Sequence, residues 1–240
     1  MNKKSLLLAG VAAFAMTSAA TAADLVVEAP PAMVYDEPAP AGNWDGPYIG
    51  AFGGWGMGFA DHTNATGGSP CVGQGIPAGT DGCDLFMDGW LVGVVAGANF
   101  HLSDEVIGGV AADIAWTDIS GTDDFPFPVD ESSNRVNWEG SIRGVLGYDG
   151  GVFMPYLTAG LAVANASHIS DAGATTVNMT HLGATAGAGA QVAVSDNVAL
   201  DLQYRVSVYG EKEYDSGAPF PPPAFALVTH RITAGINVGF

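Results

Sequence analysis

Hydrophobic and polar residues alternate one for one along most of the chain after residue 44. The segment 198–209 shows this best, with Val198, Leu200, Leu202, Tyr204, Val206 and Val208 on its apolar parity. Alternation with period two is typical of a β-strand whose two faces meet different surroundings. The segment 228–240 repeats the pattern, with His230 as the polar exception, and six others fit it: 47–60, 88–100, 105–117, 135–148, 153–167 and 178–194. The pattern therefore predicts eight strands.

The connections between these segments alternate in length. Those at 62–87, 118–134, 168–177 and 211–226 are long, and those at 101–104, 149–152 and 195–197 are short. Outer-membrane barrels have long outer loops and short periplasmic turns, and a sheet in lipid must close because open edges leave backbone groups unpaired. We therefore predict an all-β fold: an eight-stranded antiparallel up-and-down transmembrane β-barrel in the bacterial outer membrane, with N- and C-termini in the periplasm. A soluble sandwich and a helical membrane protein are the competing interpretations. Pro155 and several glycines interrupt the uncharged stretch 150–167 and disfavour the helical one.

Aromatic residues bracket the apolar parity. Trp90 and Phe100 are ten residues apart, as are Trp138 and Tyr148. Ten residues of strand span about 33 Å, which a barrel tilt reduces to roughly 25 Å, the height of the apolar band between two aromatic girdles. The girdle residues predicted on this basis are Trp55, Phe59, Trp90, Phe100, Trp116, Trp138, Tyr148 and Phe240.

The opposite parity carries the charges. All four arginines fall on it, with Arg135 at the rim, and so do three acidic residues. The predicted lumen charge network consists of Asp113, Glu139, Arg143, Asp201, Arg205 and Arg231. Eight strands leave an interior just wide enough for side chains, and inward glycines such as Gly160 and Gly187 make room for arginine. We predict a lumen plugged by arginine–carboxylate pairs; a wet, unpaired lumen is the alternative.

The N-terminal region differs from the rest. Lys3 and Lys4, an apolar run and a small-residue cleavage site at 20–22 predict a signal peptide over 1–22. Residues 23–43 are rich in proline and acidic residues, which predicts an extended periplasmic linker. The barrel is then expected over 44–240.

Composition excludes some classes of protein. Of the 240 residues, 13% are charged and 48% hydrophobic, with a formal net charge of −18. Such a chain is too hydrophobic for a disordered protein and lacks the basic patches of a nucleic-acid-binding one. The expected partners are outer-membrane lipids and lipopolysaccharide, with host or cell-surface ligands at the acidic loops, which carry Asp118, Asp123, Glu211 and Glu213 among others.

Candidate chemical sites are few. Cys71 and Cys83 are the only cysteines, and export to an oxidising compartment predicts one disulfide between them. His168 and His181 share the inward parity at the loop-side mouth, near Asp171, and two histidines with a carboxylate can hold a metal or meet a haem. Ser170 beside them raises the alternative of a nucleophile set. Histidines in a solvated rim explain the pattern more simply, so we predict no metal, no cofactor and no enzyme activity.

Several stretches carry a family resemblance. They are WDGPYIG at 44–50, RGVLGY at 143–148, PYLTAGLA at 155–162, SDN at 195–197 and HRITAGINVGF at 230–240. In this order they resemble the alphaproteobacterial small outer-membrane proteins, the porin-like or opacity-type surface-antigen barrels. The resemblance implies eight strands and a terminal Phe240 that the outer-membrane assembly machinery reads. Gln191 and Gln203 stand where the family often has Glu, so the lumen network above is argued from this chain's own charges.

The resemblance does not settle the activity, because family members are described as structural proteins, surface antigens, weak porins and haem binders. We expect a structural or surface protein of the bacterial envelope that displays its loops outside the cell. A small porin-like channel for passive diffusion of small solutes is the alternative, and a haem- or metal-binding surface protein is a third.

Overall fold

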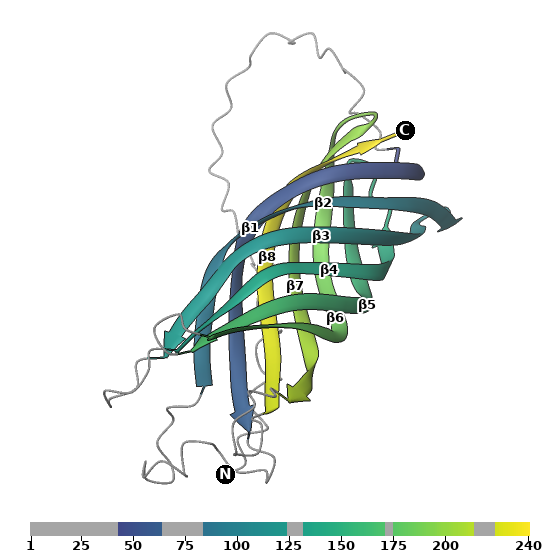
Figure 1. The fold of residues 1–240 in the computed structure, drawn as a ribbon. Coiled ribbons are helices and arrows are strands. Elements are labelled where there is room, and N and C mark those ends of the chain that lie inside the picture. The colour runs from purple at the N-terminus through teal and green to yellow at the C-terminus, as the bar shows by residue number, and fades with distance from the viewer. Residues whose placement is uncertain (1–42, 64–83, 124–131, 171–174, 214–223) are drawn as a thin grey trace, which may run out of the picture. The chain divides into compact units, whose positions relative to one another are not determined.

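The computed structural model describes residues 43–63, 84–123, 132–170, 175–213 and 224–240. Eight antiparallel strands follow one another in this part of the chain: β1 (Gly46–Thr63), β2 (Asp84–Ser103), β3 (Val106–Asp123), β4 (Ser132–Tyr148), β5 (Phe153–Ser170), β6 (Thr175–Ser195), β7 (Val198–Glu213) and β8 (Ala224–Gly239). Each strand pairs with the next, and β8 pairs with β1, so the sheet closes into a barrel (Figure 1). The predicted fold class is confirmed. No helix in the described ranges is long and apolar enough to span a membrane.

Several strands run further than the hydrophobic pattern predicted. Strand β6 begins at Thr175 rather than 178, and β7 continues to Glu213. Asp118 and Asp123, expected in a loop, therefore lie within β3, and Glu211 and Glu213 lie within β7. The reason is that backbone pairing does not require an apolar face, since ladder hydrogen bonds satisfy the main chain whatever the side chains are. The strands thus extend past the apolar band on the side of the long connections, here called the loop side; the other end is the turn side.

The two faces of the sheet differ as the alternation predicts. Large apolar side chains on the outer face stay uncovered by the protein, including Ile142, Leu161 and Leu182. Inward residues on the same strands are buried, for example Ser141, Ala162 and His181. An uncovered apolar outer face is what a barrel presents to acyl chains.

Two irregularities of register change which way side chains point on β4. The pairing shifts between Trp116 and Ile119 on β3, and between Val136 and Trp138 on β4. An extra residue in one strand of a pair makes a β-bulge, which re-aims the side chains beyond it. Val136 is therefore buried, whereas Arg135 is exposed on the outer face. The prediction that Arg135 faces inward is wrong, because one-for-one alternation in the sequence does not reveal the bulge.

The lumen is filled by three successive layers of side chains. An apolar cluster on the turn side includes Trp44, Ile107 and Ala199, and a second apolar cluster on the loop side includes Ala115, Ile119 and Tyr209. Along β3 the charged residue Asp113 falls between Ile107 and Ala115, and along β7 Arg205 falls between Ala199 and Tyr209. A charged layer is thus enclosed by apolar layers on both sides.

Candidate functional site in the lumen

The centre of the charged layer is the carboxylate of Asp113 on β3. Arg205 on β7 donates from Nη1 to Oδ1 and from Nη2 to Oδ2, each at 2.8 Å. Arg231 on β8 donates from Nη2 to Oδ2 at 2.6 Å, and Arg143 on β4 and the Ser141 hydroxyl also donate to Oδ1. Arg205 is only 2% exposed. One buried carboxylate therefore collects guanidinium groups from three other strands, in the charge-assisted geometry that gives the strongest protein hydrogen bonds.

Each of these arginines faces a glycine on a neighbouring strand. The register pairs Arg143 with Gly160, Arg205 with Gly187, and Arg231 with Gly56. A side chain at Gly187 would place its Cβ 2.5 Å from the Tyr204 carbonyl oxygen and 3.2 Å from the Cα of Arg205. Gly160 and Gly187 make room as the sequence predicted. Gly56, which was not predicted, leaves room for Ile119 and Leu91 rather than for the arginine, because a Cβ there would meet those two side chains.

A second carboxylate, Glu139 on β4, shares one of the arginines. Arg231 Nη1 lies 3.6 Å from Glu139 Oε2, while the hydroxyls of Tyr209 and Thr229 donate to Oε1 at 3.2 and 3.0 Å. Glu139 is buried, so these contacts replace the water that the carboxylate loses. The layer therefore contains three guanidinium groups and two carboxylates in mutual contact.

Asp201 on β7 lies apart from this cluster. It accepts a hydrogen bond from the Tyr156 hydroxyl at 2.8 Å, and Gln203 Nε2 donates to the same hydroxyl at 2.9 Å. No salt bridge reaches Asp201 among the described residues. The predicted pairing of Asp201 with arginine is therefore absent there, because Asp201 lies four residues, about 13 Å of strand, on the turn side of Arg205. Tyr156, Gln203, Tyr209 and Thr229 were not predicted; their only sequence signal is a polar group on the inward parity.

Little space is left beside the charged layer. A cavity of about 20 Å³ lies between Arg143, Arg231, Tyr156 and Asp201. A cavity needs roughly 10–15 Å³ to hold one water molecule, so this one has room for about one. The interior at this height is packed rather than channel-like.

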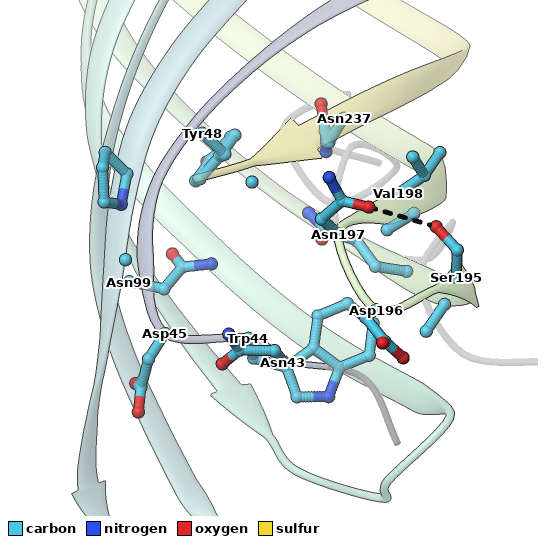
Figure 2. Close-up of a pocket in the computed structure, with 16 residues that line it drawn as sticks. Asn43, Trp44, Asp45, Tyr48, Asn99, Ser195, Asp196, Asn197, Val198 and Asn237 are labelled. Atoms are coloured by element: carbon cyan, nitrogen blue, oxygen red, sulfur yellow. Dashed lines mark hydrogen bonds between the residues drawn. The ribbon is translucent and has the colours of Figure 1, made fainter. Parts of the chain in front are cut away.

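Trp44 closes the turn-side end of the lumen. Figure 2 shows its indole among Tyr48, Asn99, Asp196 and Asn197. Trp44 is 6% exposed, and its Nε1 donates to the Gly151 carbonyl at 3.0 Å. The space beside it measures about 30 Å³. The residue predicted to begin the barrel thus also covers the turn-side end of the lumen.

A histidine between two carboxylates ties the chain segments together near Trp44. His101 Nδ1 lies 2.8 Å from Asp45 Oδ1, and Nε2 lies 2.9 Å from Asp149 Oδ2. Because carboxylates accept but do not donate, only the imidazolium, with two N–H groups, satisfies both contacts. His101 lies on the turn side of Phe100, beyond the apolar band, and hydrogen bonding to Asp149 and then Asp45 raises its pKa above the ordinary value.

The residues predicted for the aromatic girdles occupy the outer face. Trp55 lies opposite Trp90 across β1 and β2, and Trp116 lies opposite Trp138 across β3 and β4. Trp138 is half-buried, and the other predicted girdle residues are exposed: Trp55, Phe59, Trp90, Phe100, Trp116, Tyr148 and Phe240. The rings of Tyr204 and His230 lie on the same face. The Tyr204 hydroxyl is 2.7 Å from His230 Nδ1, and the centre of the Phe59 ring is 5.8 Å from that of the His230 ring.

His168 and His181, the candidate ligands for a metal or haem, lie at different heights in the barrel. The register places His168 opposite Val177 and His181 opposite Ala164, about 13 Å apart along the strands. His181 is fully buried, with Nδ1 3.5 Å from the Gly210 carbonyl, so the prediction of a solvated rim histidine is wrong there. Over the described ranges no group of three or more His, Cys, Asp or Glu residues is placed to hold a metal. Cys71, Cys83 and Asp171 lie outside the described residues.

Comparison with known proteins identifies the family. The outer membrane protein beta-barrel domain matches residues 7–240. The 25 kDa outer-membrane immunogenic protein of Brucella abortus is 32% identical over 213 residues, 88% of this chain and 87% of the relative. The 22 kDa outer membrane protein of Rhizobium leguminosarum is 34% identical over 176 residues, 73% of this chain and 69% of the relative. Both come from the alphaproteobacterial group that the sequence resemblance named.

Solved structures of other barrels are similar in outline. Neisserial surface protein A has 18% identity and a TM-score of 0.45, with 81% of this chain and 97% of that chain covered. OprG of Pseudomonas aeruginosa has 10% identity and a TM-score of 0.47, with 83% and 99% covered. With its closed eight-stranded sheet and its match to the family along almost its whole length, the chain belongs to the outer membrane protein beta-barrel domain family and is a protein of the bacterial outer membrane.

Proposed function

We propose that this outer-membrane barrel is a structural and surface protein of the envelope whose lumen is closed to solutes. The observation that carries the proposal is the Asp113 cluster, which joins four strands across the lumen and is enclosed by two apolar layers. In this proposal the long connections face the outside of the cell and display their acidic residues there, while both chain ends are periplasmic. No catalytic or cofactor role is part of it.

The packing argues against a diffusion channel. A hydrated solute needs a continuous polar path, whereas this lumen alternates between apolar and charged layers. Opening it would require the three arginines to leave Asp113. Removing one partner from a buried ion pair costs about 3–5 kcal/mol, because the remaining charge stays buried and uncompensated. The closed arrangement is therefore the stable one.

The relatives support a role at the cell surface. The Brucella relatives are named outer-membrane immunogenic proteins, a name that suits proteins with segments at the cell surface. Long loops on a rigid barrel are where binding functions usually reside. For this chain we propose the same display, with outer-membrane lipid around the apolar outer face and host or cell-surface ligands as candidate partners of the loops.

Solute uptake by proteoliposomes tests the proposal. Vesicles containing the purified protein are expected to swell in an isosmotic pentose solution no faster than empty vesicles, whereas vesicles with a known porin swell rapidly. Swelling that scales with the amount of this protein would contradict the closed lumen and favour the porin-like alternative.

A further inference from the structure

The bulge on β4 places Arg135 in a polar row on the outer face of the barrel. The register aligns Ser120, Arg135, Ser167 and Asn178 across β3, β4, β5 and β6. Two to four residues nearer the turn side, the same strands align Trp116, Trp138, Asn165 and Thr180. The outer face therefore changes here from apolar to polar, directly beyond two tryptophans of the predicted girdle.

Hydrogen bonds hold this polar surface in place. Asn137 Nδ2 donates to Asn165 Oδ1 at 2.9 Å and to Ser167 Oγ at 2.5 Å. Ser167 in turn donates to Asn178 Oδ1 at 2.6 Å, and Asn165 Nδ2 lies within 3.4 Å of Thr180 Oγ1. Such a network would be costly against hydrocarbon, where polar groups find no further partners. Its position instead suits the headgroup region of the bilayer.

Arg135 gives this surface a positive charge. Of the arginine and lysine side chains that the structure describes, Arg135 alone points outward. Its ion pair with Asp118 is long, 3.8 Å, and its two side chains are 53% and 45% exposed. Exposed pairs of this kind contribute little. The guanidinium, with its five N–H donors, therefore keeps donors for an external anion.

We propose that this surface, defined by Arg135, Asn137, Asn165, Asn178 and Thr180 and called here the polar patch, binds the phosphorylated sugar headgroup of an outer-leaflet glycolipid, lipopolysaccharide. Arg135 takes a phosphate, and the amides and hydroxyl take sugar hydroxyls. Trp116 and Trp138 lie beside the patch, where indole rings favour the boundary between acyl chains and headgroups. The inference rests on the proposed orientation with the loops outside.

Charge complementarity favours this occupant. The chain has a formal net charge of −18, and Arg135 is the one outward-facing cationic side chain among the residues that the structure describes. A guanidinium at headgroup height offers a local attraction, and arginine binds phosphate with two parallel hydrogen bonds. The bulge is what turns this side chain outward, which gives the irregularity of β4 a function.

Binding of purified lipopolysaccharide to the full chain in detergent micelles tests the proposal. Arg135→Gln is expected to weaken binding of rough lipopolysaccharide about tenfold, and Asn165→Ala about threefold. His230→Gln, on the outer face of β8, is the matched control and should bind like the unaltered protein. The folded state of each variant is verified by its heat-modifiable mobility on a gel.

Two further ligands distinguish the source of the phosphate. Dephosphorylated lipopolysaccharide should bind the unaltered protein and Arg135→Gln equally, and phosphatidylglycerol micelles, which lack the sugars, should bind the unaltered protein more weakly than lipopolysaccharide does. The proposal is overturned if Arg135→Gln binds lipopolysaccharide normally, if the control loses as much, or if phosphatidylglycerol binds as tightly.

These results can be separated from those on the lumen. If the protein does not bind lipopolysaccharide and admits no solute into vesicles, only the glycolipid site is overturned. If it admits solutes but binds lipopolysaccharide through Arg135, only the closed lumen is overturned. Detection on intact cells of an epitope inserted between Glu213 and Ala224 tests the orientation by itself; an epitope detectable only after lysis would overturn both the display of loops and the glycolipid site.

Discussion

Asp113 and Arg205 form a two-pronged ion pair across the full width of the lumen, with 2.8 Å from each guanidinium nitrogen to its own carboxylate oxygen. Their strands, β3 and β7, lie four places apart in a ring of eight and so face each other. Neighbouring strands are already joined by backbone hydrogen bonds. This pair adds a connection between opposite walls, which a hollow barrel would lack.

Removing the centre of this connection should destabilise the barrel strongly. Asp113→Ala leaves three guanidinium groups buried around an empty position, and we expect the free energy of unfolding to fall by about 3–5 kcal/mol. Urea unfolding in lipid vesicles, followed by tryptophan fluorescence, measures it. Arg135→Ala removes an exposed pair as the matched control and should cost at most about 1 kcal/mol. Equal effects of the two substitutions would show that the Asp113 cluster adds nothing special.

The glycines opposite the arginines give a second prediction. A Cβ at Gly187 would lie 2.5 Å from the Tyr204 carbonyl oxygen, so backbone must move, whereas a Cβ at Gly144 would meet nothing closer than 3.9 Å. We expect Gly187→Ala to destabilise by about 1–3 kcal/mol through this overpacking. Gly144→Ala should be neutral or slightly stabilising, because alanine also restricts the unfolded chain. Equal unfolding midpoints in urea would contradict the packing described here.

The turn-side histidine predicts a dependence on pH. His101 donates to Asp45 and Asp149 only as the imidazolium, and its pKa in the folded protein is raised, chiefly by the hydrogen bond to Asp149. Its stabilising contribution is therefore complete below the unfolded pKa of about 6.5, and it disappears as the pH rises through the higher folded pKa. An NMR titration of the His101 ring should give a midpoint above 6.5.

Asp149→Asn is the test of this cause. It should lower the His101 midpoint toward the ordinary value, since the hydrogen bond that contributes most to the raised pKa is weakened. His230→Gln, remote from this contact on β8, should leave the midpoint unchanged. A His101 midpoint at or below 6.5 in the unaltered protein would exclude the bridged imidazolium.

The sequence sufficed for the strands and for the inward position of Asp113, because period-two alternation reports directly which solvent each face meets. It did not reveal which acid receives the arginines, since Asp113 and Asp201 have the same parity and only the register separates them. Arg135 was misplaced for a related reason. A bulge shifts parity by one residue without a change in composition, and this one is visible only in the pairing of β4 with β3 and β5.

Gly56 is a second position whose surroundings the alternation in the sequence does not reveal. It lies on the inward parity of β1, but its place opposite Arg231 follows from the closure of the barrel, and the side chain that it makes room for, Ile119, comes from β3. Pairings between distant strands depend on the stagger of the whole ring. The buried His181 is a further case, because rim and core positions on one strand differ only in height, which alternation does not report.

The closed lumen is tested most directly by single-channel recording of the purified protein in planar bilayers. A closed lumen predicts no steady ion conductance from the unaltered barrel, because the Asp113 cluster lies between two apolar layers and the cavity beside it has room for about one water molecule. A steady conductance, reproducible from one insertion to the next and lost when the protein is omitted, would contradict it.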